Sequence, residues 1–323
     1  MTEISPVQGA TLSLEQLIAL QKVATGFELT TQRKILSSML GGHQSSFRGR
    51  GMDFDEVRAY QPGDEVKSID WRVTARTNEV HTKVFKEEKE RPIFIITDQS
   101  SSLAFGSQTA FKSVTAAYTA ALLAWASYRS GDRVGGIIFS DHSHKEIKPK
   151  EGKKSILRYL QILADYNQQL IKNKIQYTNA STRRVFTLDD ALASLHRVIR
   201  PGSLIFILSD FIGFNQQTIN NIRLLNRHND LISFHIFDPL EKMAPKKGTY
   251  PVSDGSNYGT WKVQSNSQRQ AYQALFLRHH EDIKATLLKQ GIPLVDICTN
   301  DNPVNILNQA LAMRRNKRGK LSA

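Results

Sequence analysis

The sequence has almost no cysteine: Cys298 is the single one among 323 residues. A disulfide framework within the chain is therefore excluded, and the apolar stretch GIPLVDICTN around this thiol predicts a buried strand. No apolar run is long enough to cross a membrane, because the nearest one, SLIFILSDFIGF, is interrupted by Asp210. The opening MTEISPVQGATLSLEQ lacks the basic and apolar regions of a secretion signal. We therefore expect a cytoplasmic protein without a membrane span.

The motifs of common enzymes are missing as well. The G-x-S-x-G elbow of hydrolases does not occur, and although histidines such as His235 are present, no pattern marks one as a general base. EGKKS at 151–155 has Ile147 where a phosphate-binding loop needs glycine, and GRGMDF at 49–54 lacks the third glycine of a dinucleotide motif. One cysteine and the histidines of HSH at 142–144 cannot form a zinc set. We therefore expect no enzymatic activity.

Acidic residues are fewer than basic ones. Lys and Arg number 43 against 30 Asp and Glu, which leaves a formal net charge of +13. Basic residues concentrate at 144–158 and 314–320, so a nucleic-acid partner is one alternative. However, no stacking aromatics interleave with the lysines, and no helix-turn-helix, zinc-finger or RNA-binding signature occurs. A solvated basic face and a basic tail are therefore the favoured interpretation.

From Arg91 onwards the chain alternates regularly between apolar strands and helices. Short β-branched runs predict five strands, at 92–98, 133–140, 203–210, 230–238 and 292–298. Helical patterns lie between them, at 109–130, 153–170, 188–199, 215–228 and 270–290. This alternation is typical of an α/β fold with a mostly parallel, doubly wound, Rossmann-like sheet. HKEIKPK at 144–150 is a candidate antiparallel edge strand.

The first part of the chain has a different character. Residues 13–40 carry apolar residues at helical spacing and predict one or two helices, and EVHTKVFKEE at 79–88 alternates like a half-buried strand. QPGD at 61–64 suits a type II turn. The sequence therefore predicts three parts: an N-terminal helical and β accessory segment over 1–88, an α/β domain over 89–312 and a basic tail over 313–323.

Two of the predicted strands end in the same chemical way. Asp98 closes IFIITD, and Asp210 closes LIFILSD. In a parallel sheet the carboxyl ends of the strands lie at one edge, and ligands bind there at the topological switch point. Two buried carboxylates at this edge repel each other unless a cation or hydrogen-bond donors lie between them. This coincidence is the strongest sign of a functional site in the sequence.

Asp98 is followed by three serines, in DQSSSLAFG. The spacing Asp98-x-Ser100-x-Ser102, on a loop that leaves a strand, directs alternate side chains toward one point. Carboxylate and hydroxyl oxygens suit Mg²⁺ or Mn²⁺ in six-fold coordination, with an open position for a carboxylate from a partner. The alternative is that the serines cap the helix that follows, which is a common role of serine.

DQSSS after an apolar strand, with LSD at the end of a later strand, resembles the metal-ion-dependent adhesion site (MIDAS) of von Willebrand factor A domains. The resemblance implies an A-like fold and a magnesium ion held by Asp98, Ser100, Ser102 and Asp210. The family adds a threonine from another loop. In VFTLDDAL, Phe186 takes the place of that threonine and Thr187 follows one residue later, so Thr187 is the candidate ligand.

The stretch GRGMDFDEVRAYQPGDEVKSIDWRVTAR at 49–76 resembles the signature of the bacterial family called domain of unknown function 58. The shared pattern is a glycine-rich start, F-x-E-x-R-x-Y, P-G-D and I-D-W-x-x-x-A-R. Members are associated with AAA+ ATPases of the MoxR type, so the resemblance implies such a partner. The mixed charges around Tyr60 and Trp71 indicate either an ion-pair network with aromatic packing anchors, which we favour, or a recognition surface.

These features together predict a non-enzymatic, chaperone-like adaptor. It would bind Mg²⁺ or Mn²⁺ and use the ion to engage an acidic protein ligand, with a MoxR-type ATPase as the partner that the family resemblance implies. A structural scaffold with a vestigial metal site and a basic nucleic-acid-binding protein are the two alternatives.

Overall fold

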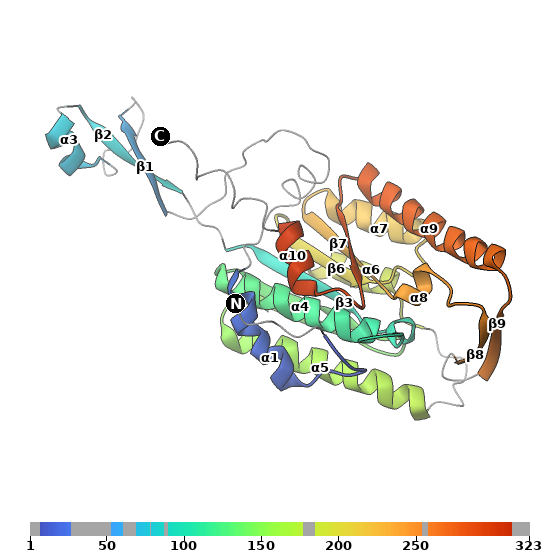
Figure 1. Cartoon of the computed structure of the whole chain (residues 1–323). Helices are drawn as coiled ribbons and strands as arrows, with labels where there is room; N and C mark the ends of the chain where they lie inside the picture. Colours follow the sequence, from blue (N-terminus) through green and yellow to red (C-terminus); the bar gives the residue numbers. More distant parts are fainter. Residues whose placement is uncertain are drawn as a thin grey trace, which may run out of the picture. The chain divides into compact units, whose positions relative to one another are not determined.

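A computed structural model of the chain divides into two compact units, one of Met1–Gly42 with Pro92–Ala323 and one of His43–Arg91. The structure describes residues 7–26, 53–60, 69–77, 79–86, 90–176, 185–253 and 258–311 (Figure 1). The turn predicted at 61–64, the basic tail over 313–323 and the helical pattern beyond residue 26 lie outside the described residues.

The larger unit is built on a six-stranded sheet. Its strands follow the order β10 (Leu294–Cys298), β7 (Asp230–Phe237), β6 (Leu204–Ser209), β3 (Pro92–Asp98), β4 (Arg133–Phe139) and β5 (His144–Lys150). All neighbouring pairs are parallel except that β5 runs antiparallel to β4. The structure therefore confirms the α/β fold with a mostly parallel sheet, the five predicted strands and the antiparallel edge strand.

Helices cover both faces of this sheet (Figure 1), because its inner strands are apolar on both sides. One core joins Ile93 and Ile95 to the helices α1 (Leu14–Val23), α4 (Lys112–Arg129), α5 (Lys153–Gln176) and α10 (Pro303–Leu311). The second core joins Phe94 and Ile96 to α6 (Leu188–Val198), α7 (Gln216–Asn226) and α9 (Asn266–Lys289). Alternate side chains of β3 thus point to opposite faces of the sheet and pack in different cores.

The described N-terminal segment, residues 7–26, is part of the larger unit and packs on its helices. The indole N–H of Trp125 in α4 donates to the carbonyl oxygen of Leu17 at 3.0 Å, and Leu12 N–H donates to Asn167 Oδ1 in α5 at 2.8 Å. Leu17 itself is fully buried. The single accessory segment expected over 1–88 is therefore divided, because the apolar face of α1 is buried against α4 and α5 rather than in the smaller unit.

The smaller unit contains the whole stretch 49–76 that resembles the family signature. β1 (Asp53–Ala59) pairs antiparallel with β2 (His81–Lys86), so the strand predicted at 79–88 is confirmed. Asp70 precedes α3 (Trp71–Thr77) and accepts the backbone N–H groups of Arg72 and Val73. The Trp71 side chain is 66% exposed. The described residues of the smaller unit therefore do not bury Trp71, and its role as a packing anchor or a recognition residue stays a prediction.

Several elements of the larger unit are absent from the sequence-based expectation. They are the helix α10, the short helix α8 (Pro239–Lys242) and the hairpin of β8 (Gly248–Ser253) and β9 (Tyr258–Val263). The hairpin residues are mostly exposed, so they lack the apolar alternation by which strands are recognised. None of the described helices combines the length and the apolar character that a membrane span requires.

Candidate functional site

The two aspartates that end predicted strands lie at the switch point of the sheet. The chain leaves β3 toward β4 on one side and later enters β6 on the other side of β3. Asp98 is the last residue of β3, and Asp210 directly follows β6. In open α/β sheets, a crevice forms outside the carboxyl ends of the strands at this point. The topology therefore brings both carboxylates to the edge where such folds bind ligands.

Asp98 is buried, with only 4% of its surface exposed. Its Oδ1 accepts the backbone N–H of Ser100 at 2.9 Å, and its Oδ2 accepts the hydroxyl of Ser209 at 2.6 Å. Burial, followed by the negative charge of Asp210, raises the pKa of Asp98 to about 7, although these hydrogen bonds act in the opposite direction. A cation nearby would favour the charged form of this carboxyl.

The serine side chains after Asp98 face each other. The hydroxyl oxygens of Ser100 and Ser102 are 3.1 Å apart, and both side chains are half-buried. Ser100 precedes the short 3-10 helix η3 (Ser101–Leu103) and makes no side-chain capping hydrogen bond, while Ser102 lies within η3. The next α-helix begins only at Lys112. The helix-cap alternative is therefore wrong, because these hydroxyls bond to one another instead of to a helix terminus.

Asp210 already has a cationic partner. The ammonium of Lys112, whose side chain is fully buried, donates to Asp210 Oδ2 at 2.9 Å and to Glu241 Oε1 at 2.6 Å. Burial by itself lowers the pKa of Lys112, but the charges of Asp210 and Glu241 outweigh it and raise the pKa above its ordinary value. The lysine is therefore held as a charged group inside the protein.

The backbone turns sharply just after Asp210. Phe211 has a φ of 55°, in the left-handed region that non-glycine residues seldom adopt. Its ring is fully buried and packs against Phe214 and His235, with ring centroids 6.0 Å and 6.3 Å apart. Ile212 N–H then donates back to Asp210 Oδ1 at 3.1 Å. Aromatic packing thus holds a strained turn that fixes the direction of the Asp210 carboxylate.

Thr187, the fifth predicted ligand, is exposed at the start of α6. Its hydroxyl donates to Asp190 Oδ2 at 3.1 Å, within the first turn of its own helix. Phe186 stacks on His144 with ring centroids 4.3 Å apart, and its N–H donates to the carbonyl oxygen of Asp141 at 2.9 Å. The structure thus brings Asp98 and Asp210 together and pairs the serine hydroxyls, while the Thr187 hydroxyl is engaged in its own helix turn.

With this geometry in place, comparison with known proteins identifies the family. Residues 56–282 match the family described as "Protein of unknown function DUF58". The chain belongs to this family. The match confirms the family that the stretch 49–76 resembles, and the likeness to von Willebrand factor A domains remains an interpretation of the site residues.

Relatives of this DUF58 chain are found in bacteria. "Uncharacterized protein Rv1480" of Mycobacterium tuberculosis and "Uncharacterized protein Mb1516" of Mycobacterium bovis are each 25% identical over 296 residues, or 91% of this chain and 89% of the relative. A solved structure, "Crystal structure of conserved hypothetical protein BatB from Bacteroides thetaiotaomicron", is 12% identical with a TM-score of 0.39, over 69% of this chain and 97% of that chain.

Sequence reasoning on this DUF58 chain missed the groups that surround the two aspartates. Lys112 stands in TAFKSVTAAY, where one charged residue among small and apolar ones is a sign of a buried cation that could have been noticed. Ser209 directly precedes Asp210, yet the sequence offers no sign that its hydroxyl turns back to Asp98. Glu241 comes from α8, an element that was not expected at all.

A cavity of about 240 Å³ adjoins the same edge of the DUF58 fold. Asp210 and Glu241 contribute to its wall, together with His235 and the aromatic rings of Tyr272 and Phe276. The apolar side chains beside it include Leu275, which is 66% exposed. The carboxylates of the site thus border a recess with both acidic and apolar walls.

Proposed function

We propose that the chain is a non-enzymatic adaptor that binds a divalent cation at the Asp98 edge and engages a partner through that ion. The proposed ligands are oxygen atoms at the switch point: Asp98, Ser100, Ser102 and Asp210. Thr187 stays outside this set, because its hydroxyl is bonded to Asp190. An all-oxygen set suits Mg²⁺, or Mn²⁺, better than softer metals.

The balance of buried charge is the observation that supports a cation here. The ammonium of Lys112 pairs with the carboxylates of Asp210 and Glu241, and the charge of Asp210 also acts on the buried carboxyl of Asp98. If all three are charged, two negative charges remain uncompensated, which matches one divalent ion. The raised pKa of Asp98, caused first by burial and then by Asp210, reflects this excess of negative charge.

The partner's contribution follows from the coordination. Serine hydroxyls are neutral ligands, and few carboxylates bind the ion directly, so its positive charge is only partly neutralised. An open coordination position can therefore accept a carboxylate from another protein. We propose an acidic side chain of the partner as this ligand. The family resemblance of residues 49–76 adds a MoxR-type AAA+ ATPase as the proposed working partner. The exposure of Trp71 supports a recognition role for that segment.

Titration calorimetry with MgCl₂ tests the site. The chelator-treated chain should bind one Mg²⁺, and Asp98→Asn, which keeps the shape of the side chain, should weaken binding by more than about tenfold, since even outer contacts of a metal site cost ~10–100-fold. Asp165→Asn removes a carboxylate from the exposed side of α5 and should leave binding unchanged. Equal Mg²⁺ affinity in Asp98→Asn and the unaltered chain would exclude this site.

Affinity capture tests the partner. The immobilised chain should retain a purified MoxR-type ATPase in buffer with Mg²⁺, and should release it when EDTA is added. Asp98→Asn should abolish retention, and Asp165→Asn should not. Retention of equal strength with and without EDTA would show that any such complex forms without a metal bridge.

A structural scaffold is the second candidate, and one observation favours it. Lys112 already neutralises Asp210 at 2.9 Å, so part of the charge that a metal would balance is balanced by the protein itself. In a scaffold, the buried ion pair would hold α4 and α8 to the end of β6. Calorimetry separates the two candidates, because a scaffold gives no heat on addition of Mg²⁺.

A further inference from the structure

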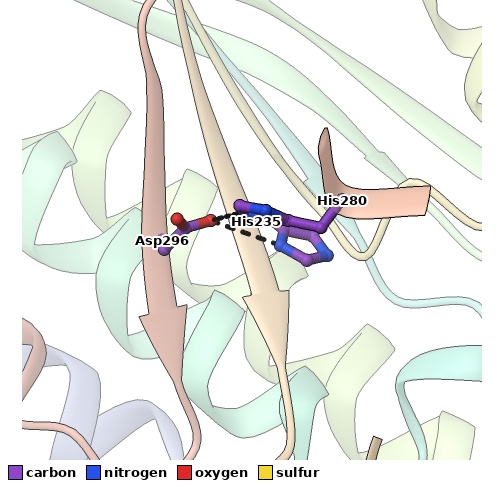
Figure 2. Close-up of side chains that lie close together, drawn as sticks. All are labelled: His235, His280 and Asp296. Atoms are coloured by element: carbon purple, nitrogen blue, oxygen red, sulfur yellow. Dashed lines mark hydrogen bonds and ion pairs between the residues drawn. The ribbon is translucent and has the colours of Figure 1, made fainter. Parts of the chain in front are cut away.

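Three metal-ligating side chains converge between β7, β10 and α9, beside the cavity that Asp210 also lines. His235 and Asp296 are register partners on the neighbouring strands β7 and β10, and His280 reaches them from α9 (Figure 2). Asp296 Oδ1 lies 3.3 Å from His235 Nδ1 and 2.8 Å from His280 Nε2. We call these three residues the His–Asp–His cluster.

We propose that the His–Asp–His cluster binds a first-row transition metal ion, with Zn²⁺ as the best fit. Two imidazole nitrogens and one carboxylate oxygen are ligands that zinc prefers, and its catalytic sites commonly have three such protein ligands. The three ligand atoms lie within 4.8 Å of one another. No other group of three His, Cys, Asp or Glu ligands meets this condition among the described residues.

The spacing of the ligand atoms supports this metal. Zinc bonds of about 2.0–2.2 Å at tetrahedral angles place neighbouring ligand atoms roughly 3.3 Å apart. The two separations at Asp296 Oδ1 are 3.3 Å and 2.8 Å, so small side-chain shifts are enough to admit the ion. On binding, the ion takes the place of the hydrogen bonds between the imidazoles and the carboxylate, and each histidine presents a nitrogen lone pair with its proton on the other ring nitrogen.

Aromatic rings fix the orientation of both histidines. His235 is 3% exposed and lies in a strand whose neighbouring residues are apolar. Its ring stacks on Phe237 and on Phe276, with centroids 5.4 Å and 6.2 Å apart, and Phe276 also stacks on His280 with an angle of 9° between the ring planes. This packing lowers the cost of ordering the ligands, and it shields one side of the site from water.

The cluster leaves one coordination position for an external ligand. Three protein ligands fill three corners of a tetrahedron, and water or a donor atom of another molecule takes the fourth. His235 and Phe276 also line the cavity of about 240 Å³ described above. An ion at the cluster would therefore lie beside a recess that is large enough for a small ligand or a side chain. This metal site is separate from the magnesium site and requires neither that ion nor the partner ATPase.

Calorimetry with ZnCl₂ on the untagged full chain, treated with EDTA and then freed of it, tests the proposal. We expect one tightly bound Zn²⁺ per chain. His280→Ala should weaken binding by more than about 100-fold, since loss of even an outer hydrogen-bond partner costs ~10–100-fold. His279→Ala is the matched control: His279 is the adjacent histidine on α9 and lines the cavity, but it is not in the cluster. This control should bind Zn²⁺ like the unaltered chain.

A second variant guards against a folding defect. Asp296→Asn keeps the size of the side chain and removes the anionic ligand, so it should also lose tight Zn²⁺ binding while circular dichroism stays unchanged. Co²⁺ bound in place of Zn²⁺ should give visible absorption bands in the unaltered chain and in His279→Ala only. If the unaltered chain binds no Zn²⁺, or if His280→Ala binds it equally well, the cluster is only a hydrogen-bond network centred on Asp296.

Discussion

Two aspartates of the same sheet, Asp98 and Asp296, have opposite surroundings. Asp98 is enclosed by oxygen groups, and burial together with the charge of Asp210 raises its pKa to about 7. Burial acts on Asp296 in the same direction, but hydrogen bonds from His235 and His280 outweigh it and hold its pKa well below the ordinary value. The neighbouring groups, and not the residue type, therefore decide which ion an aspartate can bind. A carboxylate among oxygen ligands suits a hard ion such as Mg²⁺, and a carboxylate beside imidazoles suits a softer ion such as Zn²⁺.

Removal of the buried cation should have the largest effect on the Asp98 side of this comparison. Lys112→Met keeps the length of the side chain but leaves Asp210 and Glu241 without their ammonium. We expect a loss of about 3–5 kcal/mol in the free energy of unfolding, because breaking a buried ion pair leaves an uncompensated charge. Urea denaturation followed by circular dichroism measures this loss.

Lys153→Met is the matched control for that variant. Lys153 begins α5 and is exposed, so the same substitution there should change the stability little. A loss of similar size in both variants, or no loss in Lys112→Met, would contradict the importance of the buried ammonium.

The two aspartates should also give the protein opposite responses to pH in the presence of a chelator. The folded pKa of Asp98, about 7, lies above the ordinary 3.8. The folded state therefore holds more protons between these values, and stability falls as pH rises through this window, on the order of 1 kcal/mol per pH unit. The pKa of Asp296 is lowered, so its contribution is present above pH 3.8 and is lost as pH falls below it.

Urea titrations between about pH 2 and pH 8 check these slopes, because this range covers the Asp98 window and the upper part of the Asp296 window. In Asp98→Asn the free energy of unfolding should fall less as the pH rises toward 7. In Asp296→Asn it should fall less as the pH drops into the acid range. The exposed-site variant Asp165→Asn should follow the unaltered chain. Identical pH profiles for Asp98→Asn and Asp296→Asn would contradict the prediction that the two aspartates affect stability in opposite directions.

The smallest expected effect concerns Thr187. Thr187→Ala removes a hydroxyl that bonds to Asp190 at the start of α6, so we expect a loss of about 1 kcal/mol in stability, as for other helix-cap residues. Mg²⁺ affinity, measured by calorimetry, should not change. Thr187→Ser, which retains the hydroxyl, should restore the stability. A clear loss of Mg²⁺ binding in Thr187→Ala would instead return this residue to the ligand set.

Much of the fold could be predicted because the core strands are recognisable as short apolar runs in the sequence. β3 and β6 are apolar at nearly every position, as expected for strands that are buried on both faces. The β8–β9 hairpin carries no such signal, since its residues are mostly exposed. The place of α1 was missed for another reason: an apolar face predicts that a helix is buried, but not which distant segment, here α4 and α5, buries it.

Candidate site residues could be predicted where they form a local motif or repeat the same chemistry at another strand end. Asp98, Ser100 and Ser102 form a motif, and Asp210 repeats the chemistry of Asp98 at another strand end. His235, His280 and Asp296 are spread over β7, α9 and β10, so only strand register and helix packing bring them together. The expectation that the sequence held no zinc set considered neighbouring histidines alone.

A crossed metal titration tests the central claim, that this fold carries a hard-ion site and a separate softer-ion site. MgCl₂ and ZnCl₂ are each titrated into the unaltered chain, Asp98→Asn and His280→Ala, with the bound stoichiometry read by calorimetry. We expect Asp98→Asn to lose the Mg²⁺ site and keep the tight Zn²⁺ site, and His280→Ala to lose the Zn²⁺ site and keep the Mg²⁺ site. Two results would contradict the claim of two separate sites: one variant loses both ions, or both variants still bind both ions.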